Sequence, residues 1–111
     1  MVYGAVDPLP TIKTKLADLV AVLKNLKSSE FKRPGKKFVF ILKTAIIRWM
    51  IEREVLRHAR KGIEFALLKK VDGCIDSDSP DRNDWLIDCD SQKQVYWSLH
   101  EILVLLNIVT D

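Results

Sequence analysis

The side chains best suited to bind a transition metal are two histidines and two cysteines, His58, Cys74, Cys89 and His100. They are separated by 16, 15 and 11 residues. Zinc sites usually take their ligands in close pairs, each of which pre-forms half of the tetrahedron. The spacing therefore predicts no metal site, and nothing else in the chain indicates a cofactor. We expect both histidines to lie on helix surfaces.

Cys74 and Cys89 are the only cysteines of the chain. Domains that depend on disulfides are usually smaller than 111 residues and richer in cysteine. Two free thiols in a reducing cytosol are therefore the favoured interpretation, although the sequence is also compatible with a bond between them.

Residues 72–90 form an acidic segment with seven carboxylates and one arginine. Such a segment could supply the oxygen ligands that Ca²⁺ prefers. An EF-hand loop counted from Asp76 requires an acidic residue or Asn at its fifth position, Gly at the sixth and Glu at the twelfth. Pro80, Asp81 and Ile87 occupy those positions, so the pattern fails. We expect a solvated loop or, as the alternative, a segment that binds a basic partner.

No set of residues shows the spacing of a catalytic centre. Neither cysteine has a histidine close in sequence that could activate it as a nucleophile. Pro34-Gly35 beside Lys36-Lys37 lacks the glycine spacing of a phosphate-binding loop. We therefore predict that the chain is not an enzyme.

Lysine and arginine provide the strongest chemical signal. Residues 1–70 hold 16 Lys/Arg and 6 Asp/Glu, a net charge of +10. Residues 71–111 hold 2 Lys/Arg and 9 Asp/Glu, a net charge of −7, so the whole chain carries +3. The cations form two groups, one in a loop and one spaced along a predicted helix face: Lys32, Arg33, Lys36 and Lys37, and Arg53, Arg57, Arg60 and Lys61. A solvated face, or pairing with the acidic segment, is the favoured interpretation. Binding to nucleic-acid phosphates or to an acidic protein surface are the alternatives.

The first and last elements are the most regular in the sequence. Apolar residues at offsets 0, 4, 7, 8, 11 and 14 predict a helix from Pro10–Thr11 to Leu26. Offsets 0, 4, 7, 11 and 14 from Val95 to Val109 predict the closing helix. We expect that helix to begin at Ser91, where Ser91 and Gln94 match a capping box.

The middle of the chain is less regular. A second helix should begin near Lys36, be apolar on most sides and therefore central, and continue through charged residues to Gly62. A bend near Ile51 is the alternative boundary, and a third helix should follow from Ile63 to about Asp72. We expect Trp49 and Trp85 in the core. Trp97 lies off the closing stripe, where it is either an exposed interface anchor or packed beneath the acidic loop.

These patterns together predict an all-α fold. We expect a single compact bundle of four to five helices over residues 1–111, with residues 1–9 flexible and the acidic loop 72–90 before the last helix. No uncharged apolar run approaches the ~20 residues of a membrane span. The first ten residues lack the features of a signal peptide. We therefore expect a soluble, cytoplasmic protein, and the sequence does not indicate its oligomeric state.

Three stretches resemble the C accessory proteins of morbillivirus- and henipavirus-type paramyxoviruses. They are DLVAVLKNLK (residues 18–27), FVFILKTAIIR (residues 38–48) and the closing helix of residues 91–109. The resemblance implies a non-enzymatic viral protein that modulates viral RNA synthesis and blunts the host interferon response, and a disordered extension before the first residue. We accordingly expect a protein-interaction module with a host or viral protein partner. An RNA- or DNA-binding domain is the alternative.

Overall fold

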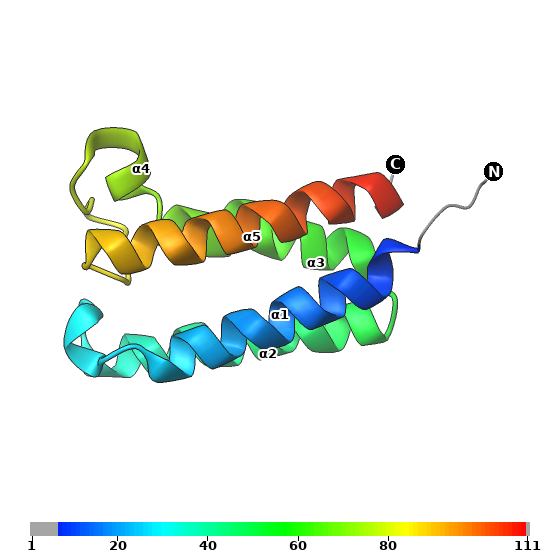
Figure 1. Ribbon diagram of the computed structural model, residues 1–111, viewed down its shortest axis with the longest axis horizontal. Coiled ribbons are helices and arrows are strands. Elements are labelled where there is room, and N and C mark those ends of the chain that lie inside the picture. The colour runs from blue at the N-terminus through cyan, green and yellow to red at the C-terminus, as the bar shows by residue number, and fades with distance from the viewer. Residues whose placement is uncertain (1–6, 111) are drawn as a thin grey trace.

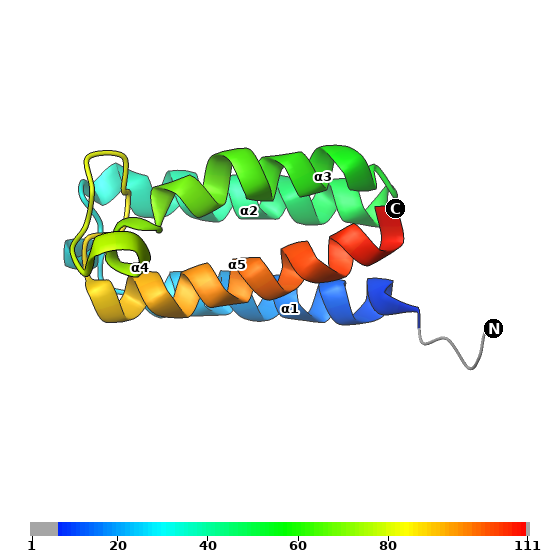
Figure 2. The ribbon, with the colours of Figure 1, turned by 90° about the horizontal axis from the view of Figure 1, so that it is seen from above.

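A computed structural model describes residues 7–110, so the predicted flexibility of residues 1–6 lies outside the described residues. Four helical segments run antiparallel in a bundle (Figures 1 and 2): α1 (Pro8–Asn25), α2 (Pro34–Glu52), the segment that begins with α3 (Leu56–Gly62), and α5 (Cys89–Thr110). α1 packs against α2 and α5, and α3 packs against the same two helices. The predicted all-α bundle is confirmed. Among the helices of the described chain, none combines the length and apolar content that a membrane crossing requires.

α1 follows its predicted stripe, with Ile12, Leu16, Leu19 and Leu23 buried. It begins at Pro8 rather than Pro10, because the carboxylate of Asp7 accepts a hydrogen bond of 3.0 Å from the Leu9 N–H. An aspartate at this position satisfies one of the unpaired donors of the first turn. Residues 8 and 9, which the sequence placed in a flexible segment, are therefore helical.

α2 ends at Glu52, so the bend near Ile51 is the correct boundary and the predicted continuation to Gly62 is wrong. The chain turns through Glu54, whose φ of 59° is left-handed and cannot continue a helix. Gly62 does not end a helix either. α3 continues into a π-helical turn, η2 (Ile63–Leu67), and a 3-10 turn, η3 (Leu68–Lys70). A Cβ on Gly62 would lie 3.3 Å from Ile47 Cδ1, so the glycine serves the close approach of α2 and α3.

The acidic segment contains a short helix, α4 (Gly73–Ser77). It lies at the end of the bundle where α2 and α5 begin (Figure 1) and is hydrogen-bonded to the bundle there. Phe31 and Leu86 form an antiparallel bridge that joins the segment to the short 3-10 turn η1 (Ser28–Glu30) after α1. The Trp85 N–H also donates to the Lys70 carbonyl at 2.9 Å. The segment is thus tied to two connections of the bundle and is not a free loop.

Cys74 and Cys89 form a disulfide, so the expectation of free thiols is wrong. Cys74 lies in α4 and Cys89 is the first residue of α5. The fold brings their Cα atoms to 5.5 Å, within the range that a disulfide requires. Sequence spacing alone does not reveal this approach, because it depends on how α4 folds back onto α5.

α5 begins at Cys89, two residues before the predicted capping box, and the predicted role of Ser91 as the cap is wrong. Asp88 is the capping residue. Its carboxylate accepts hydrogen bonds from the Ser91 N–H at 3.0 Å and the Ser91 hydroxyl at 2.9 Å, which lower the pKa of Asp88. The predicted core stripe is confirmed, with Val95, Leu99, Ile102 and Leu106 buried.

The disulfide should contribute about 3 kcal/mol to the free energy of unfolding, the loop-closure value for a loop of about 15 residues. Chemical denaturation of the wild type and of the Cys74→Ser/Cys89→Ser double variant measures this difference. Wild-type protein in reductant is the control and should behave as the double variant does. Two titratable thiols in the native, unreduced protein would contradict the bond.

Candidate functional site

The solvent side of α2 is apolar along most of its length. Its large side chains are exposed, by 69% for Phe38, 48% for Leu42, 44% for Ile46 and 52% for Trp49. With exposed Ala45 they stand at offsets 0, 4, 7, 8 and 11, the spacing of one helix face. We call these five residues the apolar face. The opposite side of α2 is the one that enters the core, through Phe40, Thr44, Ile47 and Ile51.

The predictions that α2 is central and that Trp49 is buried are therefore wrong. In a four-helix bundle each helix occupies a corner and packs against two neighbours, so a helix with two apolar stripes leaves one uncovered. The Trp49 indole is instead covered in part by the guanidinium of Arg53, which lies 5.0 Å from the ring centroid.

The apolar face continues into a shallow groove between α2 and the α3–η2 segment. The groove has a volume of about 160 Å³ and is lined by Lys43, Ile46, Ile47, Met50, Gly62, Ala66 and Leu67. Phe65 of η2 is 60% exposed, and the Lys69 ammonium lies 5.7 Å from its ring centroid. Exposed apolar surface thus extends from α2 across to η2, with cations beside it.

A second surface is a cleft around Trp85, where the acidic segment joins the bundle. We call it the basic cleft. It has a volume of about 230 Å³ and is lined by Lys32, Arg33, Lys36, Lys70, Arg82, Asn83, Asp84 and Trp85. The ammonium groups of Lys36 and Lys70 lie 4.8 and 5.1 Å from the Trp85 ring centroid. Trp85, predicted to be core, is partly buried beneath these cations and contacts Phe40 edge-on.

The structure brings together three of the four cations of the first predicted group, Lys32, Arg33 and Lys36. It adds Lys70 and Arg82, which sequence reasoning missed because they lie far along the chain from that group. The fourth predicted cation, Lys37, points elsewhere. Its ammonium donates to the carbonyls of Lys24 at 2.9 Å and Leu26 at 2.6 Å, where it closes the C-terminal end of α1.

The second predicted group does not line one helix face, because α2 ends at Glu52. Arg53 follows that end, whereas Arg57, Arg60 and Lys61 belong to α3. Arg60 is partly buried and donates to the Thr110 hydroxyl at 3.1 Å. The acidic segment lies at the opposite end of the bundle from the α2–α3 turn (Figure 2), so it does not cover Arg57 or Lys61.

Trp97 lies on the solvent side of α5 and is 50% exposed. It contacts Tyr96 and His100 on its own helix, with ring centroids 5.0 and 5.4 Å away. Of the two alternatives for Trp97, the exposed position is thus the one that the structure shows. His58 is exposed in α3 and His100 partly exposed in α5, as predicted.

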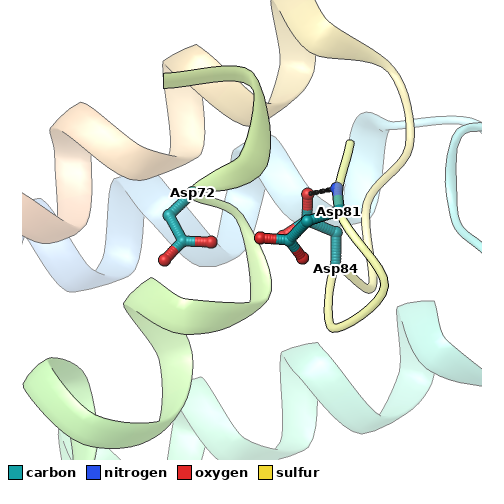
Figure 3. Close-up of side chains that lie close together, drawn as sticks. All are labelled: Asp72, Asp81 and Asp84. Carbon is teal, nitrogen blue, oxygen red and sulfur yellow. Dashed lines mark hydrogen bonds between the residues drawn. The ribbon is translucent and has the colours of Figure 1, made fainter. Parts of the chain in front are cut away.

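Three carboxylates of the acidic segment converge on one point (Figure 3). Each of Asp72, Asp81 and Asp84 contributes an oxygen, and these oxygens lie within 4.8 Å of one another. We call these residues the acidic cluster. Burial, with the hydrogen bond and charge of Asp81, raises the pKa of Asp72 to about 6. Burial also raises the pKa of Asp84. The EF-hand test from Asp76 could not find this cluster, which includes a residue before that position.

Two residues hold the acidic cluster together. Gly73 permits the close packing, since a Cβ there would lie under 3.0 Å from Asp84 Oδ2, the Asp81 nitrogen and the Ser79 oxygen. Buried Gln92 of α5 donates from Nε2 to Asp84 Oδ2 at 2.7 Å and to the Leu86 carbonyl, and its Oε1 accepts from the Cys74 N–H at 3.0 Å. The cluster is therefore built on the bundle and not on a loose loop.

Comparisons with known proteins identify no relative of this chain. No protein-family model, no curated protein and no solved structure matches it. The resemblance to the paramyxovirus C proteins thus stays a prediction from the sequence.

Gly73→Ala should lower the free energy of unfolding by about 2 kcal/mol, because the added methyl group overpacks the contact with Asp81 and Asp84. Gly35→Ala is the matched control, since a Cβ at Gly35 would meet nothing within 4 Å. Urea denaturation of both variants measures the effect. Equal stability of the two variants would contradict the close packing around Gly73.

Proposed function

We propose that this chain is a non-enzymatic protein-interaction module that binds an amphipathic helix of a partner protein along the apolar face of α2. The observation that carries the proposal is the spacing of that face. Its offsets of 0, 4, 7 and 11 are those of Ile12, Leu16, Leu19 and Leu23, the buried stripe through which α1 packs in the bundle, and Ile46 adds offset 8. A contiguous apolar patch of this kind on a protein surface is typical of an interaction site.

The charges beside the apolar face indicate the chemistry of the partner. Lys43 and Arg48 flank the face on α2, and Arg53 lies over Trp49. Lys69 lies over the exposed Phe65 of η2. The acid on this flank, Glu52, is already paired with Arg48 at 3.5 Å. A symmetric contact between two copies of this chain would place the cations beside the face of one copy near those of the other, and like charges repel. A helix with acidic residues beside its apolar stripe would instead pair with them, in the helix-in-groove mode.

The resemblance to the C accessory proteins supports a finer form of this proposal. The partner would then be a viral or host protein, and the function would be to modulate viral RNA synthesis and interferon signalling in the cytoplasm. The Cys74–Cys89 disulfide argues against that compartment, because disulfides form and persist in oxidising environments. The interaction surface itself does not depend on the viral assignment.

A synthetic helix with leucines at offsets 0, 4, 7 and 11 and flanking glutamates is the probe for the apolar face. We expect it to bind with micromolar affinity by fluorescence anisotropy. The Leu42→Gln/Ile46→Gln variant should weaken binding at least tenfold, about 1.4 kcal/mol, because it removes apolar contacts at the centre of the face. The matched control Val104→Gln/Ile108→Gln, on the exposed side of α5, should bind as the wild type does.

Two results would contradict this proposal. A lysine-flanked version of the same peptide that binds equally well would show that the flanking cations do not select the partner. A dimer in sedimentation equilibrium that dissociates in Leu42→Gln/Ile46→Gln would identify a second copy of the chain as the occupant of the face.

Nucleic-acid binding is a second candidate function, favoured by the five cations of the basic cleft. Phosphates bound there would release counterions. Because two ammonium groups already lie against the partly buried Trp85 ring, the cleft presents charge and not a stacking platform for bases. The expected binding is therefore independent of base sequence.

Anisotropy with labelled single-stranded RNA and duplex DNA tests this second candidate. We expect Lys32→Gln/Lys36→Gln to weaken binding and to flatten its salt dependence, because each lost phosphate contact lowers the slope of log K against log salt by about 0.7 to 0.9. Arg57→Gln/Lys61→Gln makes the same change of charge on α3. A larger loss in that control would place the binding site on α3, and no binding at low salt would exclude the function.

A further inference from the structure

Asp84 distinguishes the acidic cluster from the other carboxylates of the segment. Its side chain is 0% exposed, and its Oδ2 accepts hydrogen bonds from the Asp81 N–H at 2.8 Å and from Gln92 at 2.7 Å. Its Oδ1 is buried without a hydrogen-bond partner, and so is Oδ1 of Asp72. Buried oxygens of this kind have lost their hydration without a replacement.

Side-chain cations do not supply that replacement. The ion pairs found among residues 7–110 lie elsewhere, at Lys15–Glu101 and Arg48–Glu52. The nearest lysines of the basic cleft are engaged with other groups: Lys36 and Lys70 lie over the Trp85 ring, and Lys32 donates to the Arg82 carbonyl at 2.7 Å. Figure 3 shows the three carboxylates facing one another, so their charge is concentrated on the space between them.

We propose that Asp72, Asp81 and Asp84 bind a Ca²⁺ ion. The donors are all carboxylate oxygens, the ligands that hard divalent cations prefer. The ion would balance two of the three carboxylate charges of the cluster and provide a partner for Asp84 Oδ1. This inference is independent of the proposed function, because the acidic cluster and the apolar face belong to different parts of the chain.

Three carboxylates from one folded segment favour Ca²⁺ over Mg²⁺, because Mg²⁺ keeps several waters and is usually held by one or two carboxylates. Two oxygens bound to one ion can lie at most twice the metal–oxygen distance from each other. This maximum oxygen–oxygen distance is about 4.6–5.2 Å for Ca²⁺ and about 4.1 Å for Mg²⁺. Every pair of cluster oxygens lies within 4.8 Å, so the cluster is compact enough for its three carboxylates to share one Ca²⁺ ion.

The ligand set differs from an EF-hand in its construction. Asp72 directly precedes α4, and Asp81 and Asp84 follow it, so the ion would join the two ends of one folded segment. The Cys74–Cys89 disulfide and the hydrogen bonds of Gln92 hold that segment against α5. Three protein ligands and water completing the shell correspond to a Kd of about 0.1–1 mM, the range of extracellular calcium modules.

Calcium titration of the full-length, chelator-treated protein tests the proposal. We expect isothermal titration calorimetry to show one site, and 10 mM CaCl₂ to raise the Tm by about 5 °C over NaCl of equal ionic strength. Tb³⁺, which replaces Ca²⁺ in such sites, should show luminescence sensitised by the neighbouring Trp85. That luminescence should fall in Trp85→Phe and be displaced by excess Ca²⁺.

Asp81→Asn and Asp72→Asn are the diagnostic variants. Each should abolish the rise in Tm with Ca²⁺. Without Ca²⁺, each should be at least as stable as the wild type, because it relieves repulsion between carboxylates. Asp76→Asn is the matched control, an exposed acid of the same segment outside the cluster, and should keep the full response.

Three outcomes would overturn the proposal: no rise in Tm for the wild type, an equal rise in Asp81→Asn, or a rise with Mg²⁺ and not with Ca²⁺. If Asp72→Asn fails to fold, Asp81→Asn decides alone, because Asp81 is exposed and an asparagine there can still accept the Asn83 N–H.

Discussion

The packing of one apolar stripe from each long helix into a single core is the interaction on which the rest of this structure depends. Leu16, Phe40, Ile63 and Leu99, one from each of the four segments, are fully buried. Each such side chain contributes roughly 1.5–3 kcal/mol through burial. Because each helix packs against only two neighbours, the same arrangement that buries one stripe of α2 exposes the other. The exposed apolar face is thus a consequence of the bundle geometry.

The connection between η3 and α5 contributes residues to both the basic cleft and the acidic cluster. Its backbone bonds to Lys70 and to the α1–α2 connection place the adjacent residues Asp84 and Trp85 between two groups of opposite sign. Trp85 lies beneath the lysines of the basic cleft, and Asp84 faces the carboxylates of the acidic cluster. The basic cleft and the acidic cluster therefore lie at the same end of the bundle, and the acidic segment does not cover Arg57 or Lys61 of α3 (Figure 2).

The disulfide and the proposed calcium site are mutually consistent. The disulfide holds α4 against α5, and the proposed ion would join the two ends of the same segment. Both features are typical of proteins that work in oxidising, calcium-rich surroundings. From the sequence we instead expect a cytoplasmic protein. The apolar face of α2 is compatible with either setting, since burial of apolar surface on a partner does not depend on the redox state of the compartment.

The sequence by itself determined the all-α class and the helices α1 and α5. In each of these helices a single apolar stripe at 3.6-residue spacing predicts both the helical conformation and the face that is buried. It could not decide the role of α2, whose two stripes, Phe40 to Ile51 and Phe38 to Trp49, are equally regular. Only the positions of the neighbouring helices select which one is covered. The disulfide, the acidic cluster and the basic cleft were likewise decided by the tertiary structure. Their members lie up to 53 residues apart in the chain and meet only when the acidic segment folds onto the bundle.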